Sequence, residues 1–478
     1  MDRIEIHQAS FRDNSGFIFR HLGCLYRQVN TSFKEEFDGY MKSGLHAALV
    51  DRGYIIEHEE VMLDAYQTEN VYKTLKPQCV SYLTYPYEWS FSQLKDAALL
   101  TLDIQLLALE FGFTLKDASA YNIQFHEGRP VLIDTLSFIR YREGPWVAYR
   151  QFCQHFLAPL LLKKYRDHRL GRLAELYIDG VPLDLASRLL PARSWFSFGA
   201  LSHLHLHAWM QRRFGASAAG KKQSLTPAWS QMDLSKLGAL MSSLRTYIAT
   251  LRWKSTDSEW GNYYDNTNYD EEAMQAKSEL IRDYLSGFGR QIELLADLGA
   301  NSGQFSRLAR QFSRQVVSFD IDELAVEQNY LRVKQEGDKT ILPVVQDLFN
   351  PSPAIGWGNH ERDSFVERGR FEVVIALALI HHLAISNNVP LIKIIALLHA
   401  LVTDWLIIEF VPKEDSQVQR LLATREDIFP NYHEQGFEEA LKGRFDIMRK
   451  DRLPHSSRVL YCLKRESASN RSVSRPTS

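Results

Sequence analysis

Cysteine is scarce in this chain of 478 residues, and the few cysteines that occur are widely spaced. They are Cys24, Cys79, Cys153 and Cys462, and none belongs to a Cys-x-x-Cys pair. This spacing excludes a disulfide framework and a structural zinc site built from cysteines. It is typical of proteins in a reducing compartment, so we expect a cytoplasmic location.

Long apolar runs and an excess of one charge sign are also absent. The longest apolar run, near 373–380, is far shorter than the roughly 20 residues that cross a bilayer. Residues 1–6 contain no apolar signal core. The formal net charge is −2, which gives the chain as a whole no attraction to nucleic acid or anionic membranes. We therefore expect no membrane insertion and no nucleic-acid partner.

The composition is that of a globular protein of two or three domains, with 45% hydrophobic and 24% charged residues. Residues 214–228 are small, polar and aperiodic, as a linker is. They separate a predicted N-terminal α+β domain, 1–213, from a C-terminal domain, 229–465. The tail, 466–478, is rich in Ser and Arg, and we predict that it is disordered.

The C-terminal domain alternates between short apolar runs and segments of helical periodicity, which predicts βαβ units and a mostly parallel sheet. Strands are predicted at 292–298, 315–320, 341–346, 371–377, 403–410, 444–449 and 458–463, and helices at 270–287, 303–314, 323–335, 390–402 and 415–425. Residues 451–457 are too few for a parallel crossover, so the last two strands form an antiparallel hairpin. The predicted fold class is α/β, a doubly wound sheet of seven strands with a reversed last strand.

Residues 292–305 contain the most informative motif of the sequence. An apolar strand leads to Asp297, a turn with Gly299 and Gly303 follows, and then a helix begins. The next strand ends at Asp320, 21 residues beyond Gly299. Glycines let a backbone approach a ligand closely, and a carboxylate at the next strand end binds ribose hydroxyls. This pattern predicts a nucleoside pocket.

Three further features distinguish the pocket from a dinucleotide site. Asn301 stands where a middle glycine often lies, Asp347 follows a third strand, and a fourth strand leads into the segment 371–382. Together this ordered set resembles the motifs of class I S-adenosylmethionine-dependent methyltransferases over roughly residues 250–465. The alternative for each acidic residue alone is that it caps a helix or ends a strand. The resemblance implies S-adenosyl-L-methionine as cofactor, bound by Asp297, Gly299, Asn301, Gly303, Asp320, Asp347 and Leu348.

Two adjacent histidines, His381 and His382, follow the fourth strand at the edge where such sheets bind ligands. A neutral imidazole can take a proton from a hydroxyl acceptor during methyl transfer. Adjacent side chains point in different directions, so we expect one of them, preferably His382, to face the cleft. The alternative is that both bond to loop backbone.

Five aromatic residues lie among Asn and Asp in the segment 253–269. Aromatic faces stabilise a sulfonium or stack on a sugar, so this segment, and Tyr264 in particular, is a candidate lid on the cofactor. The alternative is a strap that packs its rings on the sheet.

The N-terminal domain carries a second motif. Asp117 and Asn122 are followed by a predicted hairpin and Asp134, the spacing by which protein kinases place a base and two magnesium ligands. Residues 70–165 thus resemble a kinase-like lobe. However, Leu115 and Leu136 replace the histidine and glycine of the kinase motifs, and no glycine-rich loop or strand lysine is evident. The resemblance implies a kinase-like domain, and these departures imply that it does not catalyse phosphoryl transfer.

Two other features have ordinary explanations. His203, His205 and His207 alternate, so they share a face and offer zinc ligands only if they lie on a strand. The basic cluster at 161–172 is most simply a solvated helix face, with phosphate or anionic-glycan contact as the alternative. We predict no metal site.

The whole chain resembles rhizobial host-specificity nodulation proteins, most clearly at 115–122, 380–388 and 425–430. The resemblance implies a role in making or modifying a lipo-chitooligosaccharide signal or a surface glycan. We therefore expect a methyltransferase that acts on a carbohydrate or another small polar acceptor. The alternatives are a phosphotransferase that uses the N-terminal site and a non-catalytic binding scaffold.

Overall fold

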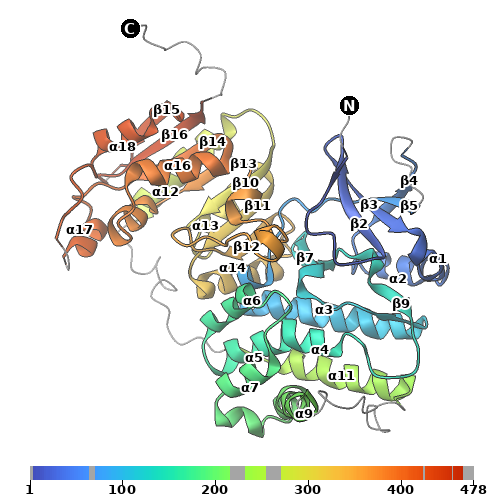
Figure 1. Cartoon of the computed structure of the whole chain (residues 1–478). Helices are drawn as coiled ribbons and strands as arrows, with labels where there is room; N and C mark the ends of the chain where they lie inside the picture. The colour runs from blue at the N-terminus through green and yellow to red at the C-terminus, as the bar shows by residue number, and fades with distance from the viewer. Residues whose placement is uncertain are drawn as a thin grey trace. The chain divides into compact units, whose positions relative to one another are not determined.

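The computed structural model describes residues 4–63, 70–215, 232–253, 271–423, 426–454 and 456–466, and for 211–215 and 271 the backbone alone. The chain forms two compact units (Figure 1). The first comprises residues 1–255 and 355–362, and the second comprises 256–354 and 363–478. The predicted disordered tail beyond residue 466 lies outside the described residues, and so does the predicted linker from residue 216 on.

The second unit is built on one sheet of seven strands in the order β12-β11-β10-β13-β14-β16-β15. Strands β10 to β14 are mutually parallel, and β16 runs antiparallel to both of its neighbours. This order, with its single reversed last strand, is the class I methyltransferase fold. The strands are β10 (Ile292–Leu298), β11 (Ser313–Asp320), β12 (Ile341–Val345), β13 (Phe371–Ala376), β14 (Val402–Phe410), β15 (Phe445–Arg452) and β16 (Val459–Arg465).

Helices cover both faces of this sheet because its strands are apolar on both sides. On one face, Leu295, Val316 and Ile375 pack with residues of α12, α13 and α14. On the other face, Phe319 contacts Phe365 of α15. The Phe437 ring of α18 contacts the rings of Phe410 and Tyr461. The helices are α12 (Glu271–Ser286), α13 (Gln304–Ala309), α14 (Glu323–Glu336), α15 (Phe365–Arg368), α16 (Leu391–Leu401), α17 (Ser416–Leu422) and α18 (Glu434–Leu441).

The first unit combines a small antiparallel sheet with a helical part. The sheet has five strands in the order β1-β2-β3-β5-β4. They are β1 (Glu5–Ile6), β2 (Gly16–His21), β3 (Cys24–Asn30), β4 (His58–Val61) and β5 (Val71–Pro77), with α1 (Lys34–Lys42) and α2 (Leu45–Asp51) between β3 and β4. Two further strand pairs, β6 with β9 and β7 with β8, lie in the following segment. These are β6 (Phe113–Leu115), β7 (Ile123–His126), β8 (Arg129–Leu132) and β9 (Phe138–Arg140).

The helical part of the first unit is centred on the long, largely buried helix α3 (Phe91–Glu110). The other helices are α4 (Tyr149–Phe152), α5 (Ala158–Tyr165), α6 (Leu173–Leu176), α7 (Leu183–Leu189), α8 (Phe198–Ala200), α9 (Leu206–Gly215) and α11 (Leu234–Thr250). No helix among the described residues is long and apolar enough to cross a membrane.

The boundary between the units differs from the predicted one. We predicted that everything from residue 229 belongs to the C-terminal domain, but α11 belongs to the first unit. It contacts α3, where the Arg245 guanidinium donates to the Asp103 carboxylate at 3.0 Å, and Lys95 donates to the carbonyl oxygens of Ala249 and Leu251. A polar segment such as 214–228 therefore marks a long connection here and not the domain boundary.

A short segment of the C-terminal sequence also belongs to the first unit. Residues 355–362 follow β12 in the chain, yet they are part of the N-terminal unit. The Arg12 guanidinium donates to both carboxylate oxygens of Glu361, at 2.8 and 3.0 Å, and the guanidinium of Arg362 lies 4.4 Å from the centre of the Tyr121 ring. Charge-assisted paired hydrogen bonds of this kind fix the position of a segment.

Candidate cofactor-binding site

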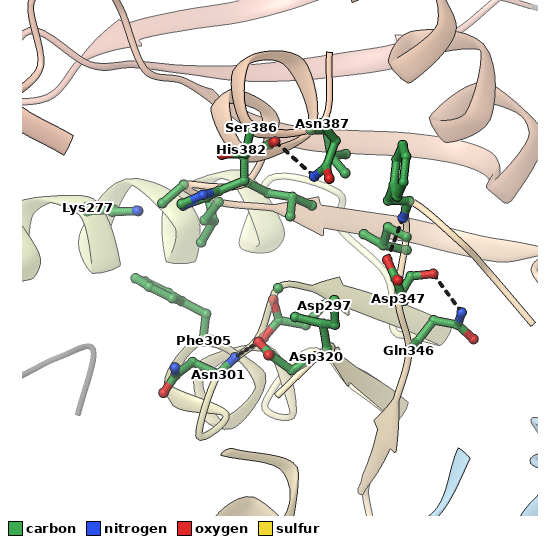
Figure 2. A pocket seen from close by; sticks show the side chains of 18 of the residues that line it. Lys277, Asp297, Asn301, Phe305, Asp320, Gln346, Asp347, His382, Ser386 and Asn387 are labelled. Carbon is green, nitrogen blue, oxygen red and sulfur yellow. Dashed lines mark hydrogen bonds between the residues drawn. The ribbon is translucent and has the colours of Figure 1, made fainter. Parts of the chain in front are cut away.

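A cavity of about 260 Å³ lies at the carboxyl ends of the parallel strands of the second unit (Figure 2). In open α/β sheets this edge is where ligands bind. Six of the eight predicted cofactor residues line the cavity, namely Asp297, Gly299, Asn301, Asp320, Asp347 and Leu348. Gly303 is not among its lining residues, and Tyr264, with most of the candidate lid 253–269, lies outside the described part of the chain.

The turn after β10 has a left-handed backbone conformation at three positions, which favours the glycines and the asparagine found there. Gly299, Asn301 and Gly303 all have positive φ, at 75°, 50° and 82°. Asparagine is one of the few non-glycine residues that adopt this left-handed conformation readily, which explains why it stands in place of a middle glycine. A Cβ at Gly303 would lie 2.5 Å from the side-chain oxygen of Asn329. Gly303 therefore shapes the turn and the start of α13.

Two carboxyl groups on neighbouring strands define the centre of the site. Asp297 accepts a hydrogen bond from the Ser306 hydroxyl at 2.6 Å, and Asp320 accepts one from the Asn301 backbone N–H at 2.7 Å. Burial raises the pKa of each carboxyl to about 6, against hydrogen bonds that lower it. Buried carboxylates of this kind gain from a ligand that brings hydroxyl or ammonium donors.

The far end of the cavity is formed by the residues that follow β11 and β12. Gln346, Ile321 and Phe349 line the cavity there together with Asp347. Ile321 and Phe349 are large apolar side chains that are more than half exposed, and apolar surface of this kind suits a flat aromatic ring. We did not predict these three residues, although each lies within two positions of a predicted carboxylate.

Lys277 is the main functional candidate that the sequence did not reveal. It lies on α12, lines the cavity and points toward its interior (Figure 2). Its ammonium group donates to the Glu409 carboxylate of β14 at 2.6 Å, and both side chains are almost fully buried. Glu409 also accepts the backbone N–H of Ala378 at 2.7 Å. Burial lowers the pKa of Lys277, and the Glu409 carboxylate opposes this shift.

No sequence signal could have identified Lys277. It is one lysine on an amphipathic helix, and its importance follows from the packing of that helix against a strand 132 residues away. Among the described residues that line the cavity, it is the only Lys or Arg.

The two adjacent histidines have different environments. His382 lines the cavity, whereas His381 is fully buried and does not. Neither ring nitrogen of His381 has a hydrogen-bond partner among the described residues. Burial lowers the pKa of His382 to about 4 and lowers the pKa of His381 well below its usual value, so both rings are neutral at pH 7. Of the two predicted catalytic residues, therefore, His382 alone is placed to contact a ligand.

The motif residues of the first unit lie close together. Burial raises the pKa of Asp117, and the nearby Asp134 carboxylate raises it to a smaller extent. The Asn122 side chain lies near Asp117 and opposes this rise in pKa, although its Nδ2 has no hydrogen-bond partner among the described residues. The guanidinium of Arg27, on β3, lies 2.5 Å from Asp134 and forms an ion pair with it.

The three alternating histidines lie on helix and not on a strand. His203 and His207 both contact the Tyr149 ring, whereas His205 stacks on Trp195. His203 bonds with the Tyr149 hydroxyl at 2.7 Å and His205 with the Ser194 hydroxyl at 2.9 Å. Within the described ranges, no group of three or more His, Cys, Asp or Glu side chains is placed to hold a metal ion.

Comparison with known proteins gives one relative that spans the chain. No family model matches this chain. It is 35% identical over 463 residues to the nodulation protein NoeA of Rhizobium meliloti (strain 1021), covering 96% of this chain and 95% of that protein.

Solved structures match less than half of the chain, at low similarity. The N-methyltransferase NodS from Bradyrhizobium japonicum WM9, in complex with S-adenosyl-L-homocysteine, is 10% identical, with coverage of 45% of this chain and 94% of that chain and a TM-score of 0.32. Magnesium protoporphyrin IX methyltransferase from Synechocystis PCC 6803, with bound S-adenosylmethionine, is 16% identical, with coverage of 45% and 87% and a TM-score of 0.29. At these scores, the fold assignment rests on the strand order and directions described above.

Proposed function

The chain belongs to the family of the nodulation protein NoeA, and on this premise we propose that it is an S-adenosylmethionine-dependent methyltransferase. One observation carries the proposal. A cavity at the carboxyl edge of a class I methyltransferase sheet is lined by the positive-φ turn after the first strand and by the carboxyl groups that end the next two strands. Each of these features matches one part of the cofactor in size and polarity.

The lining residues divide the cavity into regions for the parts of the cofactor. Asp320, at the end of β11, receives the ribose hydroxyls. Ile321 and Phe349 hold the adenine ring between apolar surfaces, with Asp347 near its amino group. Asp297 lies deeper and receives the ammonium of the amino-acid end.

Lys277 receives the carboxylate of that amino-acid end. A zwitterion that enters a buried site needs an opposite charge for each of its own charges. Asp297 supplies the negative charge and Lys277 the positive one, and the two side chains are near enough for the Asp297 carboxylate to raise the pKa of Lys277.

The acceptor occupies the side of the cavity formed by the segment after β13. His382, Ser386 and Asn387 line the cavity there (Figure 2), and imidazole, hydroxyl and amide groups suit a polar acceptor. The cofactor supplies a methyl group activated on a sulfonium. The protein aligns the acceptor for in-line attack and excludes water. His382, neutral at pH 7, accepts a hydrogen bond from the acceptor hydroxyl and takes its proton as the methyl group is transferred.

The acceptor is a carbohydrate or another small polar molecule. NoeA is by name a nodulation protein, and we propose that this chain modifies a nodulation signal, such as a lipo-chitooligosaccharide, or a related surface glycan. Incubation with radiolabelled cofactor and fractionated extracts of the producing cells tests this proposal. Label in a glycan fraction supports it, and label confined to protein or nucleic acid contradicts it.

Calorimetry tests the cofactor directly. The purified chain should bind S-adenosyl-L-homocysteine, and Asp320→Ala and Gly299→Trp should each abolish the signal. Trp at position 299 would combine an unfavourable φ of 75° with a bulky ring in the cavity. If the wild-type chain binds the cofactor but no extract consumes it, the chain is a binding protein and not an enzyme.

The first unit supports a second, separate proposal, that it is a kinase-like module without phosphoryl transfer. In kinases, a lysine on the third strand contacts phosphates, and an aspartate holds magnesium. Here Arg27, on the third strand, is itself paired with Asp134, so the carboxylate is already neutralised without a metal. Titration of the full chain with magnesium-ATP should give no heat of binding. Binding that Asp134→Asn abolishes would contradict this proposal.

A further inference from the structure

A loop of the first unit exposes three aromatic side chains within four residues. Trp195 and Phe196 end the short helix η7 (Ala192–Phe196), and Phe198 begins α8. Their exposed fractions are 45%, 91% and 79%. Single exposed apolar residues are ordinary, but a contiguous aromatic group on a surface marks a site of contact.

The loop is held in place by polar contacts beneath it. The Trp195 ring stacks on His205 with ring centres 4.1 Å apart. His205 is fixed between the hydroxyls of Ser187 and Ser194, at 2.8 and 2.9 Å. These buried contacts leave the two phenylalanine rings pointing outward, so their exposure is a property of the fold and not of a loose segment.

Basic side chains lie beside these rings. The Arg193 guanidinium donates to the backbone oxygen of Tyr165 at the end of α5, which brings Lys164 and Arg166 next to the loop. Among the described residues, none of these three basic side chains forms an ion pair. Residues 161–198 contain seven Lys and Arg against four Asp and Glu, so this region is positive in a chain whose net charge is −2. Of the basic cluster noted in the sequence, Lys164 and Arg166 belong to this surface, whereas Lys163 is buried and donates to the Trp89 carbonyl oxygen.

We propose that this aromatic-basic surface, formed by Trp195, Phe196, Phe198, Arg193, Lys164 and Arg166, binds the surface of an anionic phospholipid membrane. Aromatic rings enter the region between headgroups and acyl chains, while Arg and Lys contact the phosphates. Three basic side chains that form no ion pair among the described residues complement the negative charge of such a membrane surface. The contact is peripheral, and it is independent of the cofactor cavity, all of whose lining residues belong to the second unit.

Vesicle flotation of the full chain tests the proposal. The wild-type protein should float with vesicles of phosphatidylcholine and phosphatidylglycerol, and much less with phosphatidylcholine alone. Phe196→Ser with Phe198→Ser should weaken binding by about tenfold or more, because two buried rings are lost. Arg166→Gln with Arg193→Gln should weaken binding to anionic vesicles only, and added salt should have the same effect.

The control is Leu22→Ser, which removes a 70% exposed apolar side chain elsewhere in the first unit and should leave flotation unchanged. Thermal melting and S-adenosyl-L-homocysteine affinity, which these variants should not alter, show that the protein remains folded. Equal flotation of the phenylalanine variant and the wild type would overturn the proposal. It would also be overturned if light scattering showed that this variant converts a dimer to a monomer without any change in vesicle binding, since the surface would then join two copies of the chain.

Discussion

Lys277 gives the sharpest test of the proposed cofactor site, because its assigned role concerns one chemical group of the ligand. Decarboxylated S-adenosylmethionine lacks only the carboxylate that Lys277 is proposed to bind. The wild-type chain should therefore prefer S-adenosylmethionine to the decarboxylated form. Replacement of Lys277 by methionine, a side chain of similar length without charge, should remove this preference.

The expected size of the effect follows from the burial of the pair. The Lys277 side chain is 2% exposed, so its interaction with a ligand carboxylate is little screened by water. A hydrogen bond to a charged group contributes about 1.5–3 kcal/mol, or about 10- to 150-fold in Kd. The affinity for S-adenosylmethionine should fall by this factor, and the affinity for the decarboxylated form should change by less than about threefold.

The single substitution has a structural side effect that a second variant removes. Without Lys277, the Glu409 carboxylate, 0% exposed, loses its partner at 2.6 Å and keeps the Arg458 guanidinium at 3.6 Å. Removal of one partner of a buried ion pair costs up to about 3–5 kcal/mol of stability. Glu409→Gln in the Lys277→Met background avoids this cost, and the amide oxygen can still accept the Ala378 N–H. Lys393→Met, an exposed position on α16, is the matched control.

Isothermal titration of both ligands into the double variant decides the outcome. A double variant that keeps the wild-type preference for S-adenosylmethionine would refute the role of Lys277. An equal loss of affinity for both ligands would indicate general damage to the cavity and would also contradict the reasoning. If the wild-type chain binds neither ligand, the failure lies in the proposed function and not in Lys277.

Four further predictions concern the same unit. Gly303→Ala should lower the free energy of unfolding, measured by urea denaturation, by about 1–3 kcal/mol, and Gly337→Ala should lower it less. Both positions have positive φ, but an added Cβ would meet atoms within 4 Å at Gly303 and none at Gly337. The affinity for S-adenosyl-L-homocysteine should rise with pH up to about 6 and then level, because Asp297 and Asp320 must ionise to receive the ligand. Ionisation of the same two carboxyl groups should instead lower the unfolding free energy of the ligand-free chain as pH rises. A folded pKa of about 6 lies above the usual value of 3.8, so the folded state holds more protons and this contribution to stability is lost between pH 4 and 6. If the contribution of these two groups, measured by calorimetry as wild type minus Asp297→Asn and Asp320→Asn, rose between pH 4 and 6, the assignment would be contradicted. His382→Ala should lower kcat by about 10²–10⁴ with the cofactor Kd unchanged within threefold, and an unchanged kcat would remove His382 from the proton transfer.

Much of the second unit was predictable because its information is local. Each strand from β10 to β16 except the largely charged β15 contains a short apolar run. The bounds of all seven strands differ from the predicted ones by at most three residues. The reversed last strand followed from the shortness of one connection. The turn residues Gly299, Asn301 and Gly303 followed from their spacing, since each adopts a backbone conformation that few residue types allow.

The boundary between the units was not predictable in the same way. The linker prediction used composition alone, which does not reveal the partner of the next helix. Helix α11 belongs to the first unit because it packs on α3, and residues 355–362 belong there because Glu361 pairs with Arg12. Both contacts join residues that are more than a hundred positions apart.

The sequence by itself determined the fold of the second unit and predicted Gly299 and the carboxylates that line its cavity, because each of these depends on residues near one another in the chain. Only the tertiary structure decided that His382, and not His381, faces the cavity. It also placed Lys277 there and gathered three aromatic rings beside basic side chains in the first unit. These features depend on which surfaces pack together, and burial and charge pairing between distant segments leave no pattern in the local sequence.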